Sequence, residues 1–358
     1  MNRKTRVLVA DDSPFVCRLL TCYLHSAADF EVVGTACDGL DALTKAKALR
    51  PDALTLDLEM PGMDGLEALA RIMRECPTPV VAVSGVTGRA ATRTLQALDL
   101  GAVDFVLKYA VGASIRPDEL CREVLAKVRA AARVRVVRSL GAWSLSSLGV
   151  AEVARKEHLS GSRQAGTALV VIGASTGGPL ALRELLSRLP DNFGAGIIVV
   201  QHMPRSFTAV LAAQLDRHCR VRVREAENGE RLEPGRVLVA PGGCHLLLRP
   251  GFRVAIHAGS PADTYCPSID AAMESAARIY GSGAVGVLLT GMGDDGARGI
   301  QAIHEKGGKT FVQDAESCVV DGMPERARER AAVDGVAPPA EIAALLVREM
   351  ERRANHAA

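Results

Sequence analysis

The stretch Val170–Pro179, with the sequence VVIGASTGGP, has the pattern of a buried β-strand that runs into a glycine-rich turn and then a helix. β-Branched residues at its start favour a strand, and Pro179 suits the first turn of a helix. Within the turn, residues 173–177 fit the G-x-S-x-G pattern of a nucleophile elbow. Ser175 is therefore a candidate nucleophile, although such a turn also suits a tight connection or a phosphate-binding loop.

The same alternation of strand and helix extends in both directions from this stretch. In the C-terminal half, strand patterns at 168–173, 196–202, 236–243, 284–291 and 309–314 are followed by helical patterns at 178–189, 206–218, 268–280, 297–306 and 324–332. In the N-terminal half, stretches at 6–12, 52–62, 79–85 and 103–108 each have the pattern of a strand followed by a turn, and they alternate with helical patterns at 15–27, 65–76 and 91–101. Such alternation predicts parallel sheets with right-handed crossovers. The expected fold class is therefore α/β, with two doubly wound parallel-sheet domains.

A change of composition separates the two halves. Residues 127–166 hold eight Lys or Arg against two Glu, and their later part is rich in Ser and Gly. We interpret this segment as a linker, helical at its start, whose positive charge is solvated rather than used for nucleic-acid contact. The predicted domains are 1–126 and 167–350, followed by a tail at 351–358.

Composition excludes several classes of protein. The 358-residue chain has a formal net charge of +2, which offers little for neutralising nucleic-acid phosphates. Apolar runs are shorter than the roughly 18–20 residues of a membrane span, and the N-terminus lacks the features of a signal peptide. The nine cysteines are scattered and form no C-x-x-C pair. We therefore expect a cytoplasmic protein without membrane insertion.

Charged and hydroxyl side chains follow the predicted strands of the N-terminal half. They are Asp11, Asp12, Asp57, Ser84 and Lys108. Sites in open α/β sheets lie at the carboxyl ends of the strands, so these side chains should converge. Three carboxylates suit Mg²⁺, and a lysine with a hydroxyl suits a phosphoryl group held beside it. A carboxylate can itself accept that group.

These motifs resemble the receiver domain of two-component response regulators, which has a flavodoxin-like fold. The resemblance covers about 120 residues, and the motifs that carry it are VLVADDSPFVCRLL, LTLDLEMPGMDGLEAL, VVAVSG and GAVDFVLK. It implies that Asp57 accepts a phosphoryl group from a phosphohistidine of a sensor histidine kinase. It also implies Mg²⁺ ligands at Asp11, Asp12 and Asp57, phosphoryl contacts from Ser84 and Lys108, and a switch residue at Phe105. The chain departs from the pattern at Tyr109, where receivers usually have a proline after the lysine.

A base and an acid for Ser175 are expected at neighbouring strand ends. His202 comes directly after the apolar run GIIVVQ, at the end of the predicted strand at 196–202, and we favour it over His245, which follows another strand. Two acids, Asp294 and Asp295, lie in a glycine-rich loop after the strand at 284–291. One could orient the imidazole while the other caps a helix, and spacing alone leaves that choice open.

The C-terminal half is similar to the catalytic domain of chemotaxis protein-glutamate methylesterases, which has a Rossmann-like fold. The resemblance covers about residues 167–350, and the motifs are IGASTGGP, QHMPRSFT, EAENGERLEPGRVLVAPGGCH, PSIDAAMESAA, GVLLTGMGDDGARG and AESCVVDGMP. It implies Ser175 as the nucleophile, His202 as the base and Asp295 as the orienting acid, with Thr176 and Met292 at the edge of the site. No cofactor is implied in this domain.

The two resemblances together imply a phosphorylation-regulated enzyme. Its substrates would be glutamate γ-methyl esters on chemoreceptor cytoplasmic domains, with methanol released, and particular receptor glutamines would be deamidated. Two alternatives stay open on the residues alone. One is a non-catalytic response regulator whose second domain binds a partner or nucleotide. The other is a DNA-binding regulator, although no helix-turn-helix pattern follows the linker.

Overall fold

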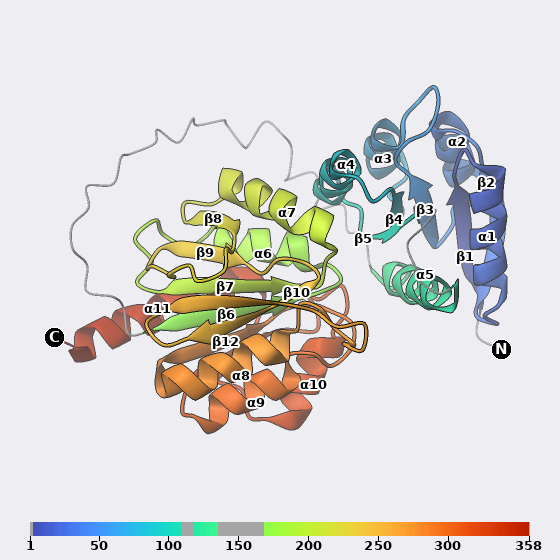
Figure 1. The fold of residues 1–358 in the computed structure, drawn as a ribbon. Helices are drawn as coiled ribbons and strands as arrows, with labels where there is room; N and C mark the ends of the chain where they lie inside the picture. The colour runs from blue at the N-terminus through green and yellow to red at the C-terminus, as the bar shows by residue number, and fades with distance from the viewer. Residues whose placement is uncertain (1–2, 109–116, 135–167, 358) are drawn as a thin grey trace. The chain divides into compact units, whose positions relative to one another are not determined.

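In a computed structural model of the chain, residues 3–108, 117–134 and 168–357 are described. The chain divides into two compact units, the first containing β1 to β5 and the second containing β6 to β14 (Figure 1). Tyr109 and most of the predicted linker, residues 135–166, lie outside the described residues. No helix in the described ranges is both long enough and apolar enough to span a membrane.

The first unit is a five-stranded parallel sheet with the strand order β2-β1-β3-β4-β5. This is the flavodoxin-like order. Its elements are β1 (Thr5–Ala10), α1 (Pro14–His25), β2 (Phe30–Ala36), α2 (Gly39–Leu49), β3 (Ala53–Asp57), α3 (Gly65–Glu75), β4 (Val80–Ser84), α4 (Gly88–Asp99), β5 (Asp104–Leu107) and α5 (Pro117–Ala131). Helix α5 continues past residue 126, where the sequence analysis ends the domain.

Burial explains why these segments form strands. Every residue of β3 and of β4 is buried, as expected for central strands of a parallel sheet covered on both faces. Helix α3 buries Ala68, Leu69, Ile72 and Met73, which recur at helical spacing on one face. Burying each large apolar side chain contributes about 1.5–3 kcal/mol. The sheet edge that carries the polar residues is thereby fixed.

The second unit is built on a seven-stranded sheet with the order β14-β13-β12-β6-β7-β9-β8, and every pairing is parallel. Its elements are β6 (Leu169–Ala174), α6 (Gly178–Leu186), β7 (Gly196–Gln201), α7 (Arg205–His218), β8 (Arg222–Glu225), β9 (Arg236–Val239), β10 (Cys244–Arg249), β11 (Arg253–Ala258), α8 (Ile269–Tyr280), η2 (Gly281–Gly283), β12 (Ala284–Leu288), α9 (Ala297–Glu305), β13 (Lys309–Gln313), α10 (Gly322–Arg330), β14 (Gly335–Ala337) and α11 (Pro339–Ala357). Together the two sheets confirm the predicted fold class.

The strand order places a topological switch point between β6 and β12. The chain moves from β6 to β7 on one side of the sheet and later returns to β12 on the other side of β6. Helices α6 and α7 lie on one side of this sheet, and α8 and α9 lie on the other (Figure 1). In sheets of this kind, the crevice outside the carboxyl ends of the strands at the switch point is where ligands bind.

Six elements of the second unit were not predicted, among them η2 and the last helix, α11. Strands β10 and β11 form a separate antiparallel pair, and β8 and β14 are short edge strands. Helix α11 runs to Ala357, so most of the predicted tail at 351–358 is helical. In β10, buried and partly exposed residues alternate, which marks a two-stranded ribbon with one face on the core.

Candidate active site

Ser175 follows β6 directly, at the switch point of the sheet. Its backbone N–H donates to Thr290 O at 3.0 Å, and its carbonyl accepts from Gly178 N at 2.8 Å. The amide of Gln201 donates to the same carbonyl at 2.9 Å. Gly177 has a φ of 77°, a left-handed conformation that glycine adopts without strain. The elbow is therefore a sharp turn that is held by the ends of two neighbouring strands.

The loop after β12 comes close to the elbow. A Cβ atom added at Gly291 would lie 2.7 Å from the Cβ of Ser175 and 2.2 Å from the sulfur of Met323. Only glycine permits such an approach. The loop that carries Met292 and the two acids is thus held beside the serine.

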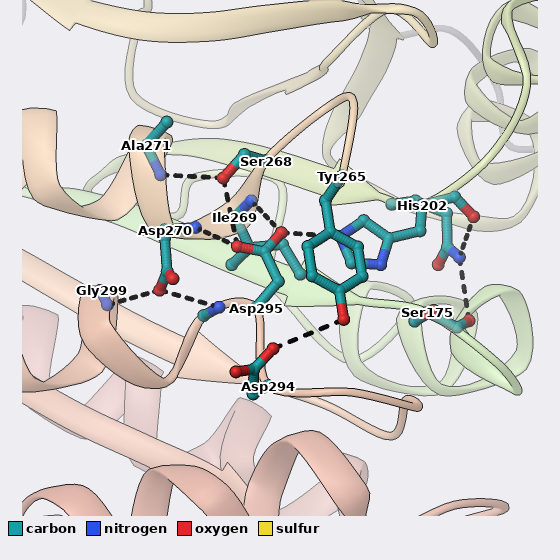
Figure 2. Close-up of polar contacts among 12 residues, drawn as sticks. Ser175, His202, Tyr265, Ser268, Ile269, Asp270, Ala271, Asp294, Asp295 and Gly299 are labelled. Carbon is teal, nitrogen blue, oxygen red and sulfur yellow. Dashed lines mark hydrogen bonds and ion pairs between the residues drawn. The ribbon is translucent and has the colours of Figure 1, made fainter. Parts of the chain in front are cut away.

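His202 is positioned by strand register. Gln201, the last residue of β7, pairs with Ala174 of β6, and His202 N donates to Ala174 O at 3.0 Å. Ser175 and His202 are therefore the first residues beyond two adjacent parallel strands. The imidazole Nε2 lies 2.8 Å from Asp295 Oδ2. Figure 2 shows the ring of Tyr265 over that imidazole, with 4.9 Å between ring centroids and 10° between ring planes.

Asp295 is buried and accepts four hydrogen bonds. Besides His202, the donors are Ser268 Oγ at 3.1 Å, Ile269 N at 2.7 Å and Asp270 N at 2.9 Å (Figure 2). Burial raises the pKa of Asp295, but hydrogen bonds and charge from His202, together with the backbone donors, lower it below the usual value overall. The carboxylate thus stays ionised at the N-terminus of α8, where the helix dipole favours negative charge.

Asp270 accepts hydrogen bonds from the N-terminus of α9, as Asp295 does from the N-terminus of α8. This buried residue in the first turn of α8 accepts from Gly296 N at 2.9 Å and Gly299 N at 2.8 Å, at the start of α9. Arg298 Nε donates to its other oxygen at 2.8 Å. Asp295 therefore caps α8, the helix that contains Asp270, and Asp270 caps α9, the helix that follows Asp295. These two caps fix the loop that holds Asp295.

The geometry distinguishes the candidates that the sequence left open. Asp294 is exposed, and its carboxylate accepts a long, 3.4 Å hydrogen bond from the hydroxyl of Tyr265. His245 pairs with Asp263 at 2.8 Å and contacts neither Ser175 nor Asp295. The structure thus brings His202 and Asp295 together. In the described part of the chain, no hydrogen bond joins Ser175 Oγ to His202.

Two other predicted edge residues lie next to these groups. Thr176 is buried, and its carbonyl accepts from Thr290 Oγ1 at 3.0 Å. Met292 is partly exposed and follows Gly291. Beside Asp295 opens a pocket of about 700 Å³, whose lining includes His245, Asp263, Tyr265, Asp294 and Asp295.

Four residues around this site were not predicted from the sequence: Gln201, Tyr265, Ser268 and Asp270. Ser268 carried a signal, because serine at the start of a helical pattern is an N-cap candidate, and its Oγ accepts from Ala271 N at 3.2 Å. Asp270 carried none, since its partners lie 26 and 29 residues further along the chain.

A second polar site lies at the strand ends of the first unit. Asp11 and Asp57 are buried there with Lys108 between them, whose Nζ lies 2.7 Å from Asp11 Oδ2 and 2.6 Å from Asp57 Oδ2. Asp12 is exposed, and the three acids offer oxygens within 4.8 Å of one another. Burial raises the pKa of Asp57, and Asp11 adds to this against the lowering effect of Lys108. Three oxygen donors with excess negative charge fit a Mg²⁺ ion.

The two remaining receiver candidates are also near this edge. Ser84 is the last residue of β4 and is buried. Phe105 is buried in β5, and the ammonium of Lys127 lies 4.9 Å from its ring centroid. Lys127 Nζ also donates to the carbonyl of Phe105 at 2.6 Å.

Comparisons with known proteins define the class of both units. Residues 7–120 match the family model of the response regulator receiver domain, and residues 170–346 match that of the CheB methylesterase. A protein-glutamate methylesterase/protein-glutamine glutaminase 1 of Geobacter metallireducens is 45% identical over 357 residues, covering 98% of each chain. The corresponding protein of Symbiobacterium thermophilum is 43% identical over 355 residues, covering 97% of this chain and 98% of the other.

A solved structure is also similar. The catalytic domain of a CheB methylesterase from Thermotoga maritima aligns with 41% identity and a TM-score of 0.49, covering 51% of this chain and 98% of that chain. The sequence matches define a response regulator with a methylesterase domain. The chain belongs to the protein-glutamate methylesterase/protein-glutamine glutaminase family.

Proposed function

We propose that this chain hydrolyses glutamate γ-methyl esters on chemoreceptor cytoplasmic domains and deamidates particular receptor glutamines. The observation that supports this most directly is the pair formed by His202 and Asp295 at the strand end beside Ser175. An imidazole fixed by a buried carboxylate, next to an alcohol on a sharp turn, is the arrangement that acyl transfer requires.

The roles follow from the hydrogen bonds. Asp295 occupies His202 Nε2, so Nδ1 is the nitrogen that takes the proton when Ser175 Oγ attacks the ester carbonyl. The methoxide then leaves as methanol with that proton. Water attacks the resulting glutamyl-enzyme with the same nitrogen as base, and the glutamate and free serine are released. Deamidation follows the same steps with ammonia as the leaving group.

Backbone donors near the elbow are suited to stabilising the tetrahedral oxyanion. Among the described residues, the N–H groups of Thr176 and Gly177 donate to no other group of the protein. The N–H of the residue after the nucleophile is the usual donor in elbows of this type. We assign the oxyanion site to these two groups.

The receiver unit is proposed to regulate this activity. Asp57 would accept a phosphoryl group from a sensor histidine kinase, and Asp11, Asp12 and Asp57 would hold Mg²⁺, which supplies neutralising charge. Lys108 and Ser84 would contact the phosphoryl oxygens, with Phe105 as the switch residue. These partners and substrates belong to the cytoplasm.

Methanol release from methylated receptors tests the enzymatic proposal. We expect Ser175→Ala to lower the rate by more than about 10³-fold, because the nucleophile is lost. Thermal unfolding should stay close to that of the parent, since the elbow is held by backbone groups. Undiminished methanol release by the folded variant would remove Ser175 from the mechanism.

A further inference from the structure

A second group of reactive side chains lies beside the proposed catalytic site and takes no part in it. His245, Asp263 and Cys266 each offer one ligand atom, and these atoms lie within 4.8 Å of one another. His245 is the second residue of β10, and the other two belong to the segment 259–268 between β11 and α8. The group therefore joins two parts of the chain.

Backbone contacts hold this segment against the start of β10. Gly243 N donates to Cys266 O at 3.3 Å, and Gly259 N donates to Gly243 O at 3.1 Å. Asp263 is fixed by a 2.6 Å bond from Ser260 N to its Oδ2. The backbone beside Cys266 and the carboxylate of Asp263 are thus held in place by hydrogen bonds.

The donor atoms have few partners outside the group among the described residues, although Asp263 Oδ2 also accepts from Ser260 N. Asp263 Oδ2 lies 2.8 Å from His245 Nε2, and Asp263 has no ion pair with a lysine or arginine among the described residues. His245 Nδ1 is buried and has no hydrogen-bond partner within the described ranges. Cys266 is a free, partly buried thiol. His245 and Asp263 also line the open pocket, which provides an entry path for an ion.

The set of donors selects the kind of ion. One imidazole nitrogen, one thiol sulfur and one carboxylate oxygen suit Zn²⁺ in a tetrahedral site with water as the fourth ligand. Mg²⁺ and Ca²⁺ prefer oxygen donors alone. We propose that His245, Asp263 and Cys266 bind one Zn²⁺ ion at the rim of the pocket beside Asp295.

Such an ion would connect β10 to the segment that carries Tyr265. Tyr265 precedes Cys266 and stacks on the imidazole of His202. Zinc binding is therefore expected to restrain the residues next to the proposed base. This effect has a readout that is independent of catalysis: amide hydrogen exchange in residues 259–266 should slow when zinc is added.

Titration with Co²⁺ tests the site directly, because cobalt bound to a thiolate absorbs in the near-ultraviolet and cobalt bound to carboxylates does not. The reduced full-length chain is used, with excess Mg²⁺ to compete for the acids of the receiver unit. We expect one equivalent of Co²⁺ to give this band and Zn²⁺ to displace it.

Substitutions identify the ligands. Cys266→Ala should abolish the band, and Asp263→Asn and His245→Gln should each weaken binding about tenfold or more. Asp263 lies on an exposed loop, so its variant is expected to fold normally. Matched controls are His257→Gln, which alters the cross-strand neighbour of His245, and Cys22→Ala, which removes an exposed thiol. Both should bind as the parent does.

Two results would overturn the proposal. One is the absence of a thiolate band at micromolar Co²⁺ and protein. The other is a band that persists in Cys266→Ala or is lost in Cys22→Ala. Neither result depends on methanol release, so a failure here is distinguishable from a failure of the proposed hydrolase.

Discussion

Two adjacent aspartates in one loop have different environments. The Asp295 side chain is buried with four donors, whereas Asp294 is exposed and its carboxylate accepts a 3.4 Å hydrogen bond from Tyr265. A carboxylate that fixes the tautomer and orientation of an imidazole must be desolvated and immobile. Only Asp295 meets both conditions.

Exchanging each carboxylate for an amide tests this assignment. We expect Asp295→Asn to lower kcat for methanol release by about 10³- to 10⁴-fold, since His202 would lose the group that stabilises its protonated form. Asp294→Asn is the matched control and should stay within a few-fold of the parent. If the Asp294 variant suffered the larger loss, the two roles would have to be exchanged.

At this scale the sequence predicted the strand-end residues well. Ser175 and His202 are each the first residue after a strand, so the apolar runs alone indicated their positions. The choice between Asp294 and Asp295 depends on how the loop turns, and that turn is set by hydrogen bonds from Ser268, Ile269 and Asp270, which are distant in sequence. No local pattern encodes such bonds.

At the scale of elements, helices α8 and α9 are coupled through reciprocal caps. Asp295 binds the N-terminus of α8, and Asp270 binds that of α9. The loop with the proposed orienting acid is therefore held by hydrogen bonds at the starts of two helices.

Removing one cap measures this coupling. Asp270→Ala should lower the free energy of unfolding by about 1–2 kcal/mol, because the start of α9 loses its acceptor. Glu274→Gln is a suitable control in the same helix, since Glu274 lies 3.9 Å from Arg298 and caps nothing. Urea denaturation checks both. An equal effect of the two substitutions would argue against the cap.

The last helix provides a test of pH dependence. Hydrogen bonds from Arg352, and then from Arg353, lower the pKa of Glu349 in α11 to about 2 from 4.5. A lowered pKa in the folded state stabilises the fold above the unfolded pKa, and this contribution is lost as pH falls from 4.5 towards 2. Glu349→Gln should therefore cost about 1 kcal/mol at pH 7.

The destabilisation caused by Glu349→Gln should become progressively smaller as the pH is lowered below about 4.5. Urea denaturation at several pH values measures this change. The exposed Glu351 supplies a control substitution, Glu351→Gln, which should show no such trend. A Glu349 effect that is constant from pH 7 to pH 3 would contradict this account.

For the whole molecule, the alternation of strands and helices was sufficient to predict two parallel-sheet units. The hairpin of β10 and β11 was missed, because it interrupts the strand–helix order and packs on the core through alternating residues. Edge strands β8 and β14 have four and three residues, too few to form a clear pattern.

Regulation is a property of both units together. Phosphorylation of Asp57 can raise the hydrolysis rate only if the free energy of phosphorylation differs between the inactive and the active conformation of the protein. We expect a small phosphodonor with Mg²⁺ to increase methanol release, and Asp57→Asn to abolish the increase. Equal rates with and without the donor, at confirmed phosphorylation of Asp57, would exclude this regulation.

Covalent labelling measures whether His202 activates Ser175. A fluorophosphonate probe should add one label per chain, and peptide mass spectrometry should find that label on Ser175. Labelling should fall sharply in His202→Gln. A label on another residue, or labelling of Ser175 at an unchanged rate in the His202 variant, would contradict the account.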